Sequence, residues 1–204
     1  MAIDGSKIVH AVMEGSRIRD AKGIIPLFGV YLSLFFVQYY NKLSFDFERM
    51  MGGKRETESE ALLIEAAHEC GYATFQGIRN SREWEELVEP MMESKEDQIY
   101  SFAAVAVAFG WGDLEVNELI PNQKLLIQVS DSYEATGYLQ QHGSATSGKC
   151  YMLRGVAGAF MDLLYGEDYP DGLFTFTAQE PLCRVKGDPY CEFIARRSSK
   201  RISQ

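Results

Sequence analysis

The sequence has few cysteines and few basic residues, and each shortage excludes a class of protein. Four cysteines among 204 residues are too few for a scaffold held together by disulfides. Lys and Arg number 20 against 29 Asp and Glu, which leaves a formal net charge of -9 at pH 7. Because nucleic-acid binding needs a basic surface that neutralises phosphates, we expect no nucleic-acid partner. The chain also lacks a Rossmann glycine fingerprint and an ATPase motif.

The beginning of the chain lacks the apolar core of a secretory signal. Residues 1–20 mix charged with apolar side chains and contain no continuous hydrophobic region. We therefore expect a cytoplasmic protein whose thiols stay reduced. In such a protein, clustered cysteines act as metal ligands or redox groups.

One long apolar run lies near the N-terminus, at Ile24–Tyr40. Its 17 residues are at the lower limit for a membrane span, and they include a proline, a serine and a glutamine. Its many Phe and Tyr residues are also typical of a helix buried against a partner subunit. We predict such a helix, and with it a homodimer, in preference to a membrane span.

Changes of hydrophobic period divide the rest of the chain into helices and hairpins. Apolar residues three and four positions apart predict helices, and strict alternation predicts strands. The expected elements are helices over about 62–75, 99–109 and 150–164, a short helix before Pro90, a hairpin of 113–120 with 125–131, and a hairpin of 173–183 with 190–195. This order predicts an α+β fold, with helices packed on a small antiparallel sheet of two hairpins and an N-terminal helical appendage.

The same pattern suggests a division of the chain into three parts. We expect a helical dimerisation segment at 1–57, a ligand-binding domain at 58–195 and a solvated basic tail at 196–204.

The second hairpin carries a group of residues that could hold a metal ion. Cys183 and Cys191 flank its turn, Glu180 precedes the first of them by three residues, and Cys150 opens the preceding helix. Three thiolates and a carboxylate suit tetrahedral Zn²⁺, whereas soft sulfur ligands disfavour Mg²⁺ and Ca²⁺. The spacing alone leaves two alternatives open, a disulfide between the two hairpin cysteines and unligated core thiols.

Five stretches follow one another along the chain: "ALLIEAAHECGYATF", "AFGWGDLEVNEL", "SDSYEA", "GKCYMLRGVAGAFMDLLYG" and "EPLCRVKGDPYCEF". Together and in this order they resemble the 4-vinyl reductase domain family, whose members are also described as predicted hydrocarbon-binding proteins. The resemblance covers about residues 58–195. It implies an α+β fold like that of the small subunits of vesicle-tethering TRAPP complexes. The sequence is also similar to the sensor domains of phenol- and xylene-responsive activators, which bind an aromatic molecule and hold zinc through three Cys and one Glu. The zinc ligands implied here are Cys150, Glu180, Cys183 and Cys191.

The ligand pocket is expected between the 99–109 helix and the sheet. The residues that we expect to line it are Phe102, Phe109, Ile127, Val129, Phe174 and Phe176. The phenol sensors direct a Trp and a His at the ligand hydroxyl, but the position expected for the Trp holds Val129, and His68 and His142 lie in other motifs. We therefore expect an apolar or aromatic ligand and poor binding of phenol.

Three functions are in keeping with these observations. The first is a zinc-containing protein that senses or carries an apolar small molecule, and it is the one we favour. The second is an enzyme or accessory of tetrapyrrole metabolism, which would need a separate redox partner. The third is a TRAPP-like assembly module that uses Ile24–Tyr40 as its contact.

Overall fold

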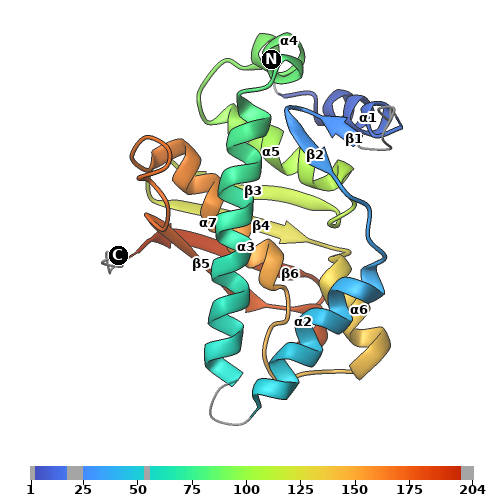
Figure 1. Cartoon of the computed structure of the whole chain (residues 1–204). Helices are drawn as coiled ribbons and strands as arrows, with labels where there is room; N and C mark the ends of the chain where they lie inside the picture. The colour runs from blue at the N-terminus through green and yellow to red at the C-terminus, as the bar shows by residue number, and fades with distance from the viewer. Residues whose placement is uncertain (1–2, 18–24, 53–55, 199–204) are drawn as a thin grey trace.

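The structure, a computed structural model, describes residues 3–17, 25–52 and 56–198 of the chain. It is an α+β fold in which helices cover a four-stranded antiparallel sheet (Figure 1). In chain order the elements are α1 (Gly5–Gly15), β1 (Ile25–Leu27), β2 (Val30–Leu32), α2 (Val37–Met51), α3 (Glu56–Arg79), α4 (Arg82–Leu87), the 3₁₀ helix η2 (Glu89–Met91), α5 (Asp97–Ala108), β3 (Leu114–Ile120), β4 (Lys124–Val129), α6 (Tyr133–His142), α7 (Tyr151–Tyr165), β5 (Phe176–Leu182), the 3₁₀ helix η3 (Arg184–Lys186) and β6 (Cys191–Arg197).

The main sheet consists of the two predicted hairpins, in the order β3-β4-β6-β5. Along the inner strand β4, Leu125, Ile127 and Val129 are buried and alternate with half-buried residues. Successive side chains of a strand point to opposite faces, so these three lie on the face that the helices cover. The α+β prediction is confirmed.

The helical layer is built around the crossing of α3 and α7, and α3 runs across the middle of the molecule (Figure 1). The two helices approach closely because α7 carries a glycine where they meet. A Cβ atom added to Gly155 would lie 2.6 Å from the backbone nitrogen of His68 and 2.6 Å from the carbonyl oxygen of Ile64. Only a residue without a side chain permits this spacing.

The N-terminal segment differs from its prediction, because the expected helix over Ile24–Tyr40 does not form. Residues 25–32 form the β1–β2 hairpin, and α2 begins only at Val37. The turn of the hairpin contains Phe28 at φ 46° and Gly29 at φ 71°, which are left-handed conformations that a right-handed helix excludes. Residue 24 itself lies outside the described part of the chain. Among the described residues, no helix combines the length and the apolar character that crossing a membrane requires.

The N-terminal segment also contributes to the main core. Helix α1, which the sequence did not predict, buries Ile8 and Val12 completely or nearly so, and both belong to the same apolar cluster as the sheet residues. The boundary predicted after residue 57 falls in the first turn of α3. Of the predicted basic tail, Arg196 and Arg197 end β6, and residues 199–204 lie outside the described part.

An exposed apolar surface begins in strand β2 of the N-terminal hairpin and continues onto α2. We call this surface the aromatic arm. Its members are Tyr31 (79% exposed), Leu34 (70%), Phe35 (71%), Phe36 (85%), Val37 (40%), Tyr39 (59%) and Leu43 (61%). Two of its rings, Phe35 and Tyr39, stack on each other at 5.5 Å. Contiguous apolar surface of this kind marks an interaction site in soluble proteins.

The close crossing of α3 and α7 predicts that Gly155→Ala destabilises the protein. The added methyl group would force backbone atoms apart, and we expect a loss of about 1–3 kcal/mol in the free energy of unfolding. Gly5→Ala is the matched control, because its Cβ would meet its nearest neighbour, Cβ of Ala104, at an ordinary 3.7 Å. Chemical denaturation of both variants measures the difference, and equal stabilities would refute this account of the crossing.

Candidate metal centre

Four residues that the sequence predicted as metal ligands lie close together at the N-terminal end of α7. Cys150 is the residue that precedes the helix, Cys183 follows β5, and Cys191 begins β6. Glu180 reaches the same place from a β-bulge, where two residues of β5, Glu180 and Pro181, oppose Phe193 alone. A bulge redirects a side chain relative to the regular alternation of the strand.

The approach of Glu180 also depends on a glycine. Any side chain at Gly148 would collide with the carboxylate of Glu180. The sequence "SGKC" therefore leaves the space through which the acid reaches the cysteines.

The distances in this cluster are those of a metal site and not of a disulfide. The Sγ atoms of Cys150 and Cys191 are 3.7 Å apart, as are those of Cys191 and Cys183, and those of Cys150 and Cys183 are 4.0 Å apart. A tetrahedral ion with metal–sulfur bonds of about 2.3 Å separates its sulfur ligands by about 3.8 Å. A disulfide needs about 2.05 Å. All three cysteines are free thiols, so the predicted alternative of a hairpin disulfide is wrong.

The electrostatics of the cluster favour a bound cation. Burial raises the pKa of Cys150 and that of Glu180 well above their usual values, because four acidic groups share one site without solvent. Hydrogen bonds from Cys150 and Cys183 lower the pKa of Cys191 to about 5. The Oε1 atom of Glu180 is buried and has no hydrogen-bond partner among the described residues. The ligand atoms all lie within 4.8 Å of one another, so these four residues can hold a metal ion.

Three positively charged side chains that are close to the cluster in sequence form ion pairs with carboxylates outside it. Lys149 forms a buried ion pair with Glu48 of α2. Arg184 lies 3.1 Å from Asp131, and Lys186 lies 3.3 Å from Asp188. Each of these three charges is therefore paired with a carboxylate outside the cluster. Backbone N–H groups also contribute, since the N–H of Arg184 donates to Sγ of Cys191 at 3.5 Å.

The sequence did not identify Glu134, a completely buried carboxylate beside the cluster. It accepts hydrogen bonds from the backbone N–H groups of Met152 (2.9 Å) and Leu153 (3.1 Å) and from the hydroxyl of Tyr40 (2.9 Å). Burial raises the pKa of Glu134 to about 8, and these three donors act in the opposite direction. The motif "SDSYEA" contained this residue, but its partners lie 18, 19 and 94 positions away.

A second buried pair, His68 and Asp162, organises the loop that follows α7. The His68 Nε2 atom lies 2.6 Å from Asp162 Oδ2, and the Asp162 carboxylate accepts from the backbone N–H groups of Phe174 and Phe176, each at 2.7 Å. The His68 side chain is thus directed into the protein, away from the exposed Cys70. The loop between α7 and β5 is held against α3 and α7 by this pair.

The six residues predicted to line a pocket lie in different places. Phe102 is at the centre of a buried aromatic cluster, with ring centroids 5.2 Å from Phe75, 5.2 Å from Trp84 and 5.3 Å from Phe160. Its helix ends before Phe109, whose ring faces Trp111 at 5.7 Å.

The other four predicted residues lie on the sheet or beyond α7. Ile127 and Val129 are buried on β4, Phe174 packs on the ring of His68, and Phe176 begins β5. The structure thus brings Ile127 and Val129 to one face of the sheet and leaves Phe174 with His68.

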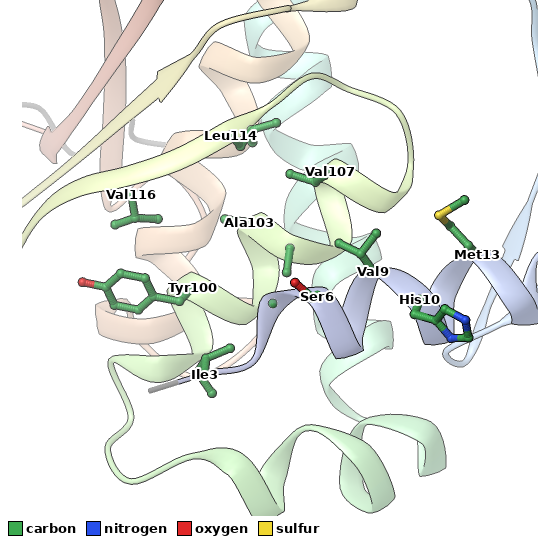
Figure 2. Close-up of a pocket in the computed structure, with 12 residues that line it drawn as sticks. Ile3, Ser6, Val9, His10, Met13, Tyr100, Ala103, Val107, Leu114 and Val116 are labelled. Atoms are coloured by element: carbon green, nitrogen blue, oxygen red, sulfur yellow. The ribbon is translucent and has the colours of Figure 1, made fainter. Parts of the chain in front are cut away.

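A cavity lies on the opposite side of α5 from Phe102. It has a volume of about 590 Å³ and lies between α1, α5 and the edge strand β3. In Figure 2, Val9 of α1 approaches Val107 of α5, and Tyr100 and Val116 face each other at the other end. None of the six predicted residues lines it.

The cavity and the metal cluster are connected through the sheet. Leu114, which lines the cavity, lies opposite Val129 on β4, and Val129 lies opposite Cys191 on β6. Two strand spacings, or about 10 Å, separate Leu114 from Cys191.

The fold is similar to those of several solved structures. The crystal structure of the phenol-responsive sensory domain of the transcription activator PoxR with phenol matches 97% of this chain and 92% of that chain, with a TM-score of 0.73 and 15% identity. A trafficking protein particle complex subunit 3 from Naegleria fowleri, covalently bound to palmitic acid, matches 82% of this chain and 98% of that chain, with a TM-score of 0.54 and 11% identity. No protein-family model and no curated protein match the chain. The expected likeness to phenol sensors and TRAPP subunits is therefore confirmed at the level of the fold.

The cluster geometry predicts that Cys183→Ser reduces both metal content and stability. Loss of one ligand leaves the remaining acidic groups buried without full compensation, and metal-binding energy is part of the folding energy. We expect a loss of about 4 kcal/mol or more, or roughly 10 °C in Tm. The matched control is Cys70→Ser, because Cys70 is exposed and outside the cluster. Elemental analysis and thermal melts should leave the control unchanged, and two variants with equal metal content would contradict the site.

Proposed function

We propose that this protein is a zinc-containing cytoplasmic protein of the 4-vinyl reductase domain family that senses or carries an apolar or aromatic small molecule. The observation that carries the proposal is the cluster of Cys150, Glu180, Cys183 and Cys191 inside a fold that also occurs in a phenol-responsive sensory domain. The five sequence motifs support the family, and their order along the chain agrees with the order of elements in the fold.

Zinc is the proposed metal because three of the four ligands are sulfur. Thiolates favour zinc over magnesium and calcium, and the sulfur separations suit a tetrahedral ion. Four protein ligands leave no coordination position for a substrate. The ion would therefore be structural, joining the start of α7 to the β5–β6 hairpin.

The proposed ligand class rests on the apolar character of the available space. The two neighbouring structures contain phenol and palmitic acid, which are both largely apolar molecules. In this chain the interior around Phe102 is filled by aromatic rings. The cavity beside α1 has mainly apolar walls, to which Ser6, His10 and Tyr100 add polar groups, and its volume is typical of small-molecule sites. We therefore place the ligand in this cavity. An interior site lined by the six residues predicted from sequence is the alternative, and it would require the aromatic cluster to repack.

The cavity beside α1 and the alternative interior site lie on opposite sides of α5. Substitutions on each side of this helix therefore test which of the two binds the ligand. Ala103 lines the cavity and its neighbour Phe102 is in the interior. A polycyclic aromatic compound at 100 times its Kd should stabilise the protein by about 2.7 kcal/mol, which thermal shift detects. Ala103→Trp should abolish this shift, and Ala61→Trp on the exposed surface of α3 should preserve it.

Phe102→Ala should lower stability by about 3–5 kcal/mol and still show the ligand shift. Loss of the shift in this variant alone would place the ligand in the interior. In a panel of phenols, polycyclic aromatics and tetrapyrroles, phenol should bind poorly at the alternative interior site, because Val129 there offers no hydrogen bond to a hydroxyl group. Tight binding of phenol would contradict this selectivity.

A second function, assembly, is favoured by the aromatic arm and by the likeness to a trafficking complex subunit. The predicted homodimer belongs to both proposals. The arm would be its contact surface, since burial of its rings against a second copy would remove apolar area from water.

Substitutions in the arm test the homodimer without damaging the core. Deletion of residues 1–50 would remove Ile8 and Val12 from the core, so single substitutions are preferable. We expect Phe36→Asp to convert dimers to monomers in light scattering at micromolar concentration. The control is Leu62→Asp on α3, because Leu62 is also more than half exposed but lies outside the arm. A monomeric wild-type protein, or a dimer that persists in the Phe36 variant, would refute the contact.

A further inference from the structure

Helix α7 begins without the hydrogen bond that the side chain of the N-cap residue, the residue just before a helix, normally provides. The N-cap residue usually supplies a side-chain oxygen to the N–H groups two and three positions later. Here the N-cap residue is Cys150, and its side chain makes no capping bond. Its Sγ atom lies in the cluster with Cys183 and Cys191 instead. The N–H groups of Met152 and Leu153 therefore need an acceptor from elsewhere in the chain.

Glu134 of α6 supplies that acceptor. Its Oε1 atom accepts from the N–H of Met152, and its Oε2 atom accepts from the N–H of Leu153. A carboxylate is a favourable group at the positive end of a helix, and here it is completely buried. The position of Glu134 thus determines where α7 starts, and the start of α7 determines where Cys150 lies.

Tyr40 of α2 orients Glu134 from the other side. Its hydroxyl donates to the Oε1 atom of Glu134 at 2.9 Å. Helix α2 makes a second, separate contact with the same end of α7, because the hydroxyl of Tyr151 donates to Glu48 at 2.6 Å. The two tyrosine–carboxylate bonds both link α2 to the start of α7, but only the first passes through Glu134.

We propose that Glu134 is a positioning residue for the metal centre, and that Tyr40 makes the metal affinity depend on the placement of α2. This inference rests on the proposed metal site. Since α2 also carries part of the aromatic arm, a partner bound to the arm and a metal bound to the cluster would influence each other through this bond.

Competition of the full-length chain with a zinc chelator tests the proposal. Glu134→Ala removes the acceptor for both N–H groups, and we expect the zinc affinity to fall about 10- to 100-fold, as for other residues that orient metal ligands. Glu134→Gln keeps one acceptor oxygen and should recover part of this loss. A purely structural role would change the melting temperature of the two variants without this graded change in zinc affinity.

The two tyrosines give a milder and matched comparison, useful if Glu134→Ala does not fold. Each of Tyr40→Phe and Tyr151→Phe deletes one hydroxyl group and with it one hydrogen bond that joins α2 to another helix. Tyr40→Phe removes the bond to Glu134, and Tyr151→Phe removes the bond to Glu48. We expect Tyr40→Phe to weaken zinc binding about 3- to 10-fold. Tyr151→Phe should remain within about twofold of the wild type, although both variants lose stability.

The outcomes separate this inference from the proposed function. A wild-type protein that binds no zinc would refute the metal site and this inference with it. A wild-type protein that binds zinc, with Glu134→Ala and Tyr40→Phe unchanged in affinity, would overturn only the positioning role. Equal weakening by the two tyrosine variants would also overturn it, because the effect would then be the general packing of α2.

Discussion

The structure depends on the meeting of four acidic side chains, three of them completely buried and the fourth half-buried. Cys150, Cys183 and Cys191 are completely buried, and Glu180 has a carboxylate oxygen without a partner among the described residues. Groups of this kind repel one another when charged and lose their interaction with solvent, so the site favours either bound protons or a bound cation. A cation would add a further link between a helix and a hairpin that already meet through apolar packing and through hydrogen bonds such as those of Arg154 with Ala178 and of Phe176 with Asp162. The stability of the sheet and the position of α7 are therefore coupled to the chemistry of this cluster.

The same cluster explains the unusual start of α7. The Cys150 side chain points into the cluster and therefore makes no capping bond to its own helix. A carboxylate from α6 caps the helix instead, and a tyrosine from α2 holds the carboxylate. Polar groups with all their partners in place specify one arrangement of the surrounding helices. In this protein they connect the N-terminal segment, which the sequence presented as an appendage, to the centre of the fold.

The distribution of apolar side chains bears on what the protein binds. The interior between α5, α3 and α7 is filled by the rings of Phe75, Phe102 and Phe160, while apolar space remains between α1 and α5. The aromatic arm is a further apolar surface, and it lies on the same N-terminal segment as α1. Ligand binding and assembly would thus both involve residues 3–50.

Much of this arrangement was available from the sequence. Periodicity indicated the helices α3, α5 and α7, and alternation indicated both hairpins. The resemblance of the motifs implied the set Cys150, Glu180, Cys183 and Cys191, which the fold brings close enough together to hold a metal ion. These signals are local, because a helix or a hairpin is determined by the spacing of residues near each other in the chain. Composition suggested a helix at Ile24–Tyr40, but the left-handed turn at Phe28 and Gly29 makes a hairpin there.

Tertiary structure alone decided the remaining features. The contacts Tyr40–Glu134, Glu48–Lys149 and His68–Asp162 join residues 94 to 101 positions apart, and no spacing rule reaches that far. Phe102 and Ala103 are adjacent apolar residues, yet one fills the interior and the other lines the cavity. Which side of a nearly uniformly apolar helix faces a core depends on the elements that pack against it, and these are placed only when the whole chain folds.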